Sequence, residues 1–183
     1  CGGDMNGDGI GDMVVSSANT GPNKGTVYVL YGTRATPADI LLSAFSNSIV
    51  RGYAIYGRDV GSNMAQSVAS VGDFNGDGKA DILIGSGTDM NGAAGRANGG
   101  MAYLILGGPS ANIDLVSFVS GTAGFKIIGS VGSAAGSVVS AGGDINGDTF
   151  ADILVGAPMS AKSSNTAAGV VYVLFGSSAS SFS

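Results

Sequence analysis

Short apolar runs separated by glycine-rich polar stretches recur along the whole chain. One kind follows an acidic segment and comprises Met13–Val15, Ile82–Ile84 and Ile153–Val155. A second kind, rich in β-branched and aromatic residues and flanked by glycines, comprises Thr26–Tyr31, Met101–Leu106 and Val170–Phe175. This composition is typical of strands. Because the runs are almost continuously apolar, both faces of each strand are expected to be buried.

Further matching segments complete a repeat. The pair Gly52–Gly57 and Gly124–Gly129 comes before two small-residue segments, Met64–Val71 and Ala134–Ala141, which lead into acidic segments. One repeat therefore contains four strands, with the acidic loop between the first two. Four antiparallel strands form a blade of a β-propeller. The sequence predicts an all-β chain with about three such blades, at approximately 1–57 (first strand missing), 58–129 and 130–183 (last strand missing).

The frame of the repeats predicts an incomplete propeller. Cys1 aligns with Ala141, so the sequence enters its first repeat after the first strand, and ten strands are expected instead of twelve. Propellers close with about 4–8 blades, and open ends leave unpaired strand edges. The expectation is a fragment, a partly resolved chain, or a protomer completed by further chains or blades.

The acidic residues are concentrated in three loops. All 13 are Asp, the formal net charge is −5, and Glu, His and Trp are absent. An acidic chain with 8 scattered Lys and Arg residues argues against nucleic-acid binding. No apolar run reaches the ~18 residues of a transmembrane segment. Without His there is no base for a Ser-His-Asp triad, and few Asp residues lie outside the loops for glycosidase chemistry, so no enzyme is predicted.

Each acidic loop presents oxygen atoms at a fixed spacing. Side-chain oxygens occupy positions 1, 3, 5 and 9, and position 7 can offer its backbone carbonyl. The candidate ligands are Asp4, Asn6, Asp8, Ile10 and Asp12; Asp73, Asn75, Asp77, Lys79 and Asp81; and Asp144, Asn146, Asp148, Phe150 and Asp152. Five or more hard oxygen donors suit Ca²⁺, whereas zinc and copper sites are implausible without His and with one Cys. The sequence predicts about three Ca²⁺ sites.

The loops allow two other interpretations. Asp, Asn and Gly are common in simple turns, but three copies with the same oxygen spacing favour metal binding. An EF-hand needs Glu at position 12, where this chain has Val15, Ile84 and Val155. The third loop also departs from the others, because Thr149 replaces the glycine of Gly9 and Gly78. A β-branched residue is expected to be strained there if φ is positive.

Together these residues resemble FG-GAP repeats, known from the propeller of integrin α subunits. Tyr56-Gly57 and Ile128-Gly129 stand where Phe-Gly is expected, and Gly156-Ala157-Pro158 is an intact Gly-Ala-Pro. The resemblance implies Ca²⁺ in the hairpin between the first two strands of a blade. It also implies an extracellular or cell-surface module for protein or glycan recognition, adhesion or structural assembly. The alternative is the propeller portion of a secreted or surface hydrolase whose catalytic residues lie outside this chain.

Overall fold

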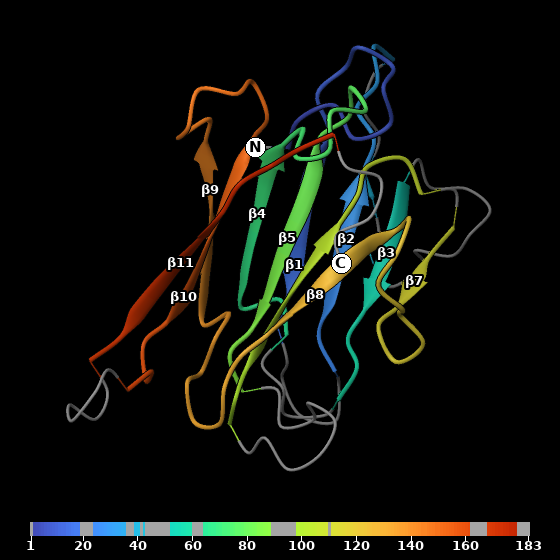
Figure 1. Cartoon of the computed structure of the whole chain (residues 1–183). Helices are drawn as coiled ribbons and strands as arrows, with labels where there is room; N and C mark the ends of the chain where they lie inside the picture. The colour runs from blue at the N-terminus through green and yellow to red at the C-terminus, as the bar shows by residue number, and fades with distance from the viewer. Residues whose placement is uncertain are drawn as a thin grey trace.

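The structure, a computed structural model, describes residues 2–18, 24–35, 39–40, 42, 52–59, 64–88, 98–109, 111–161 and 168–178. Cys1 lies outside the described residues. The described part is all-β and contains eleven strands arranged in three sheets that stand side by side (Figure 1). This confirms the predicted fold class of successive propeller-type blades. The three sheets do not close into a ring.

The first sheet has the strand order β1-β2-β3-β7, the second β4-β5-β6-β8 and the third β11-β10-β9. The strands are β1 (Met13–Ser17), β2 (Thr26–Leu30), β3 (Gly52–Tyr56), β4 (Ser67–Gly72), β5 (Asp81–Ser86), β6 (Met101–Ile105), β7 (Ile113–Asp114), β8 (Gly124–Ile128), β9 (Val138–Gly143), β10 (Asp152–Ala157) and β11 (Val170–Leu174). Each of the ten predicted strands coincides with one of them. The two small-residue segments begin as turns, because Ala65 and Ala134 have positive φ angles, and their strands start a few residues later.

The sequence missed strand β7, which corrects the expectation of purely antiparallel blades. Residues of β7 lie in the second repeat but pair in parallel with β3 of the first sheet, with Ile113 opposite Ile55. The Leu115 N–H donates to the Tyr56 carbonyl at 3.0 Å, and Asn112 Oδ1 accepts from the Ala54 N–H at 2.9 Å. The strand satisfies the free edge of β3. Two residues are too few to produce a readable hydrophobic pattern.

The hydrophobic core lies between the sheets. One buried cluster joins Val27 and Val29 of β2 to Ile82 and Ile84 of β5. A second joins Leu83 of β5 to residues of the third sheet, including Ile153 and Val155 of β10. Packing between neighbouring sheets therefore holds the repeats together, as expected for blades.

Burial on both faces, expected for the apolar runs, is complete only in the middle of the stack. Every residue of β5 and β6 is buried. By contrast, β1 and β11 carry exposed and half-buried residues throughout. The expectation is therefore wrong for β1 and β11, which belong to the outer sheets, because each of these sheets packs against one neighbouring sheet instead of two. Within the described residues, no helix has the length and apolar character needed to cross a membrane.

Candidate metal centre

The three acidic loops occupy the same place in successive repeats. The second loop connects β4 to β5, the third connects β9 to β10, and the first leads into β1. Beside the second and third loops the register of the first strand pair shifts, near Gly72 and at Asp152. Gly72 and Gly143 have φ angles of 82° and 70° at these bulges, so glycine is needed there. The bulges turn the chain out of the sheet and into the loop.

The Asp at position 1 folds each loop around its own carboxylate. In the first loop, Asp4 Oδ1 accepts from the N–H groups of Gly7 at 2.7 Å and Asp8 at 3.0 Å. Its Oδ2 accepts from the Gly9 N–H at 2.7 Å. Asp73 and Asp144 make the same three bonds in their loops. These N–H groups lower the pKa of Asp4, with the Gly9 bond as the largest cause.

Positions 3 and 5 join this arrangement. The Asp8 N–H that reaches Asp4 Oδ1 also donates to Asn6 Oδ1 at 2.9 Å. Asn6 Nδ2 donates to Asp8 Oδ2 at 2.9 Å, and Asp8 Oδ1 accepts from the Ile10 N–H at 2.8 Å. The second and third loops repeat all of these contacts. The structure therefore brings the predicted side chains of positions 1, 3 and 5 together.

Position 9 is placed differently. Asp12 is 6% exposed, and Asp81 and Asp152 are fully buried. Asp12 Oδ2 accepts from the Met5 N–H at 2.7 Å, while Oδ1 accepts from the Gly32 N–H at 2.8 Å. Asp81 and Asp152 bridge the equivalent groups of their repeats at 2.7–2.9 Å. Each of these carboxylates therefore links its loop to the chain just after a strand of the same sheet, which is β2, β6 or β11.

Sequence reasoning missed the glycine partner of position 9, although its signal was present. A Gly follows each aromatic strand, at Gly32, Gly107 and Gly176. A Cβ at these positions would lie 2.3 Å from the Gly11 carbonyl oxygen, 2.7 Å from that of Ala80 and 2.5 Å from that of Ala151. Only glycine allows the strand end to come close enough for its N–H to reach the buried carboxylate.

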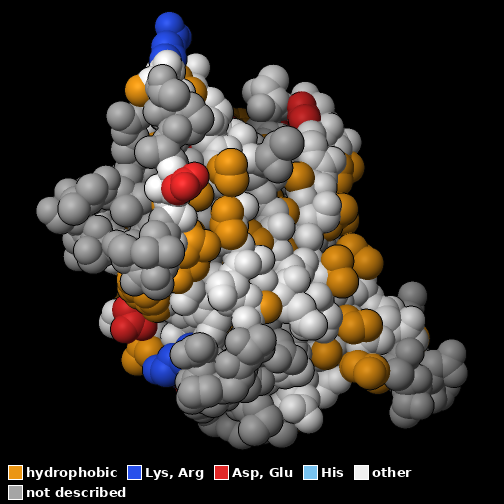
Figure 2. Space-filling model, turned by 180° about the vertical axis from the view of Figure 1, so that it is seen from behind, with side chains coloured by type: hydrophobic (Ala, Val, Ile, Leu, Met, Phe, Trp, Pro, Cys, Tyr) orange, Lys and Arg blue, Asp and Glu red, His pale blue; other side chains and the backbone are white. Residues whose placement is uncertain are grey.

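The carboxylates of one loop influence each other. The pKa of Asp81 is raised to about 7: burial is the largest cause and the neighbouring Asp77 and Asp73 add to it, while the Gly107 and Phe74 N–H bonds act against it. Repulsion of this kind is what a bound cation relieves. Arg58–Asp59 is the one ion pair found in the described residues, so no Lys or Arg there forms an ion pair with a loop carboxylate. On the rear face of the molecule, Figure 2 shows only a few Lys, Arg and Asp side chains among the described residues.

The donor set of the loops fits a hard divalent cation. Carboxylate, amide and carbonyl oxygens are the ligands that Ca²⁺ prefers. The loops fit such a cation in their donor chemistry and in their hydrogen-bonded turn. In the described part of the chain, however, no three Asp, Glu, His or Cys side chains converge on one point. The carboxylate at position 9 is buried and bonded to two backbone N–H groups instead. The predicted Thr149 strain is present, since φ is 77° there and 80° and 82° at Gly9 and Gly78.

Comparison with known proteins supports the interpretation of the repeats. The FG-GAP repeat model matches residues 65–105 and 135–174, and the FG-GAP-like repeat model matches residues 4–84. The chain belongs to the FG-GAP repeat family. It is 30% identical to integrin alpha-PS5 of Drosophila melanogaster over 85% of its length and 35% identical to integrin alpha-IIb of Mus musculus over 69%. It spans 14% and 12% of the length of these two relatives.

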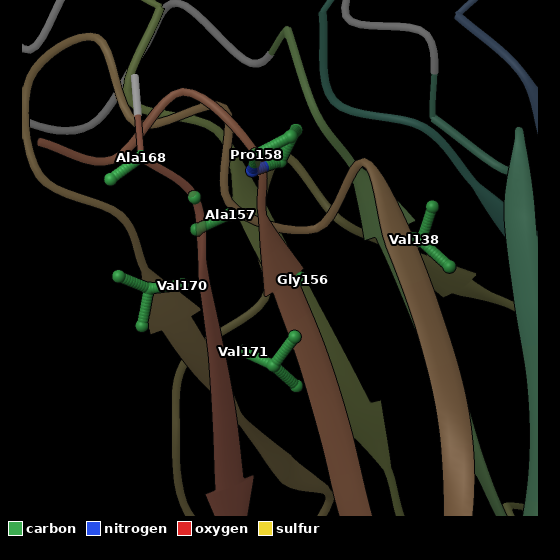
Figure 3. Close-up of a pocket in the computed structure, with 8 residues that line it drawn as sticks. Val138, Gly156, Ala157, Pro158, Ala168, Val170 and Val171 are labelled. Atoms are coloured by element: carbon green, nitrogen blue, oxygen red, sulfur yellow. The ribbon is translucent and has the colours of Figure 1, made fainter. Parts of the chain in front are cut away.

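The third sheet of this FG-GAP chain also carries an open apolar groove (Figure 3). Val138 of β9, Gly156 and Ala157 of β10, Pro158, and Val170 and Val171 of β11 line it. The Gly156-Ala157-Pro158 motif thus forms part of its wall. Val138 and Val171 are 63% and 64% exposed, and Val173 and Phe175 are exposed nearby. This face is the one that a neighbouring sheet covers in the first and second repeats.

Proposed function

We propose that the chain is a calcium-binding propeller module, extracellular or at the cell surface, that serves recognition, adhesion or structural assembly and is not an enzyme. The observation that carries the metal assignment is the threefold repetition of one oxygen-rich turn with the same hydrogen bonds. Similarity to integrin alpha subunits supports the surface role. The proposed ligands are the side chains of positions 1, 3, 5 and 9 and the carbonyl of position 7.

The protein's own residues prepare each loop for the ion. Backbone N–H groups lower the pKa of Asp4, and the same three bonds orient the position-1 carboxylates of the other two loops. The position-9 carboxylate has both oxygens occupied by N–H bonds, and each oxygen retains a further lone pair for a ligand. The bound ion supplies positive charge that offsets three carboxylates in one turn. Its role is therefore to stabilise the end of the blade.

Thermal unfolding with and without calcium tests this proposal. Calcium at ten times its Kd is expected to add about 1.4 kcal/mol for each filled site, and each kcal/mol raises Tm by about 2–4 °C in a chain of this size. EDTA should reverse the increase. Asp8→Asn removes a proposed ligand and should reduce the calcium effect, whereas Asp39→Asn removes the same charge from an exposed position outside the loops. Equal calcium responses in both variants and the unchanged protein would contradict the assignment.

We also propose that the exposed face of the third sheet packs against another four-stranded repeat, in the same chain or in a further one. The equivalent face of the second sheet supports this. There a Cβ at Gly85 would lie 2.1 Å from the Gly136 carbonyl, and one at Gly100 would lie 2.2 Å from that of Ala135. Small residues thus admit the turn of the next repeat. Segments 1–57, 58–129 and 130–183 are the corresponding approximate repeat units. A protein or glycan partner would bind to the assembled module.

A further inference from the structure

The acidic loops of neighbouring blades are bonded directly to one another. The N–H of Ala80, at position 8 of the second loop, donates to the carbonyl oxygen of Asp4 in the first loop at 2.8 Å. The N–H of Ala151, at position 8 of the third loop, donates to the Asp73 carbonyl at 3.0 Å. The same bond therefore links each loop to the loop before it.

Both ends of this bond belong to peptide groups that also serve the proposed sites. The N–H of Ala80 shares its peptide group with the carbonyl of Lys79, the position-7 ligand of the second loop. The described residues contain no cis peptide bond, so this carbonyl and the Ala80 N–H point in opposite directions. Fixing the N–H on Asp4 therefore fixes the direction of the Lys79 carbonyl.

The carbonyl group that accepts this bond is in turn linked to position 9 of its own loop. The Asp4 carbonyl shares its peptide group with the Met5 N–H, which donates to Asp12 Oδ2 at 2.7 Å. The second junction repeats this, because the Asp73 carbonyl shares a peptide group with the Phe74 N–H, which donates to Asp81 Oδ2 at 2.8 Å. Two peptide groups thus connect the position-7 carbonyl of one loop to the position-9 carboxylate of the preceding loop.

We propose that this two-peptide relay couples calcium binding in adjacent loops, so that an ion in one loop raises the affinity of its neighbours. The inference rests on the proposed calcium sites. A cation held by the Lys79 carbonyl would polarise that peptide group and strengthen the Ala80 N–H bond to Asp4, which would fix the backbone of the first loop more firmly. An ordered second loop also holds the first loop's backbone in place, and the next ion then loses less conformational entropy on binding. Loops two blades apart share no such bond in the described residues.

Repulsion between the ions opposes this coupling. Two dications in neighbouring loops disfavour each other through space, and this effect decreases with ionic strength. Bonds through the backbone are buried between the blades, since Met5 is fully buried and Ala80 is 7% exposed. The positive coupling should therefore be largest at high salt.

Site-resolved calcium titration by NMR tests the relay. The amides of Gly7, Gly76 and Gly147 report on one loop each, because each donates to its own position-1 carboxylate at 2.7 Å. Asp77→Asn weakens the second loop directly. In 0.5 M KCl, the midpoints of the calcium titrations followed at the Gly7 and Gly147 amides should then move to calcium concentrations about fivefold higher. This is a typical size for coupling between two sites. Midpoints at these two glycines that stay unchanged or decrease would overturn the coupling.

Two proline variants locate the connection. Ala80→Pro removes the N–H between the first and second loops, so Gly7 should become insensitive to Asp77→Asn while Gly147 keeps its response. Ala151→Pro should give the opposite pattern, which makes each variant the control for the other. If either variant fails to fold, the Asp77→Asn comparison still decides. If no glycine responds to millimolar calcium, the calcium sites themselves are refuted; independent responses at all three refute only the relay.

Discussion

Thr149→Gly should stabilise the protein, because Thr149 is the one position where a loop departs from the glycine of its two counterparts. Its φ angle of 77° is left-handed, which costs a residue with a Cβ about 1–2 kcal/mol. Glycine in its place makes the unfolded chain more flexible, at a cost of about 0.4–1 kcal/mol. The net gain is therefore about 0.5–1 kcal/mol. Thr149 is exposed and bonds to Asp144 Oδ2 through its backbone N–H, which glycine keeps.

Thermal unfolding in saturating calcium measures this gain. An increase in Tm of about 1–4 °C is expected for a chain of this size. The matched reverse variants are Gly9→Thr and Gly78→Thr, where an added Cβ meets no atom within 4 Å, so any loss of stability reports backbone strain alone. Both should lower Tm by a similar amount. An unchanged or lower Tm for Thr149→Gly, or no loss in either reverse variant, would refute the strain argument.

Three further predictions concern the blades and the buried carboxylates. Val27→Asp should unfold the protein, because Val27 is fully buried between sheets. Val171→Asp, at the equivalent position of the third repeat, should change Tm little, since Val171 is 64% exposed. Similar losses of Tm for the two variants in circular-dichroism melts would contradict this. Gly107→Ala should cost about 1–3 kcal/mol in urea denaturation, because its Cβ would lie 2.7 Å from the Ala80 carbonyl, while Gly121→Ala meets nothing within 4 Å and serves as the control. The pKa of Asp81 is raised to about 7 in the fold and is about 3.9 in an unfolded chain, so calcium-free protein should lose stability as pH rises from about 4 to 7. Asp81→Asn should make that pH profile flatter, and an unchanged slope would count against the buried carboxylate as its cause.

Most of the fold could be predicted because the same sequence pattern occurs in each of the three repeats. Glycines flank the same β-branched and aromatic runs three times, and each run became a strand. Strand β7 could not be predicted, since the free edge of β3 selects Ile113 and Asp114 through backbone bonds, which any sequence can supply. The exposure of Val171 and Val173 also differs from expectation, because burial depends on whether a neighbouring sheet is present.

The residues of the site could be predicted from the sequence, but their arrangement could be predicted only in part. Oxygen spacing identified Asp4, Asn6 and Asp8, which the structure gathers around one backbone N–H. The spacing gave no sign that Asp12 would be buried and bonded to the distant Gly32. That contact links two strands of a blade, so it follows from tertiary packing. The glycine at each strand end was visible in the sequence, but its purpose required the fold.

Anomalous X-ray scattering from crystals grown with calcium tests the central claim most directly. The account predicts a calcium peak in each loop, coordinated by oxygens of positions 1, 3, 5, 7 and 9 at about 2.3–2.6 Å. Loops that keep the same hydrogen-bonded turn but show no peak at millimolar calcium would contradict it.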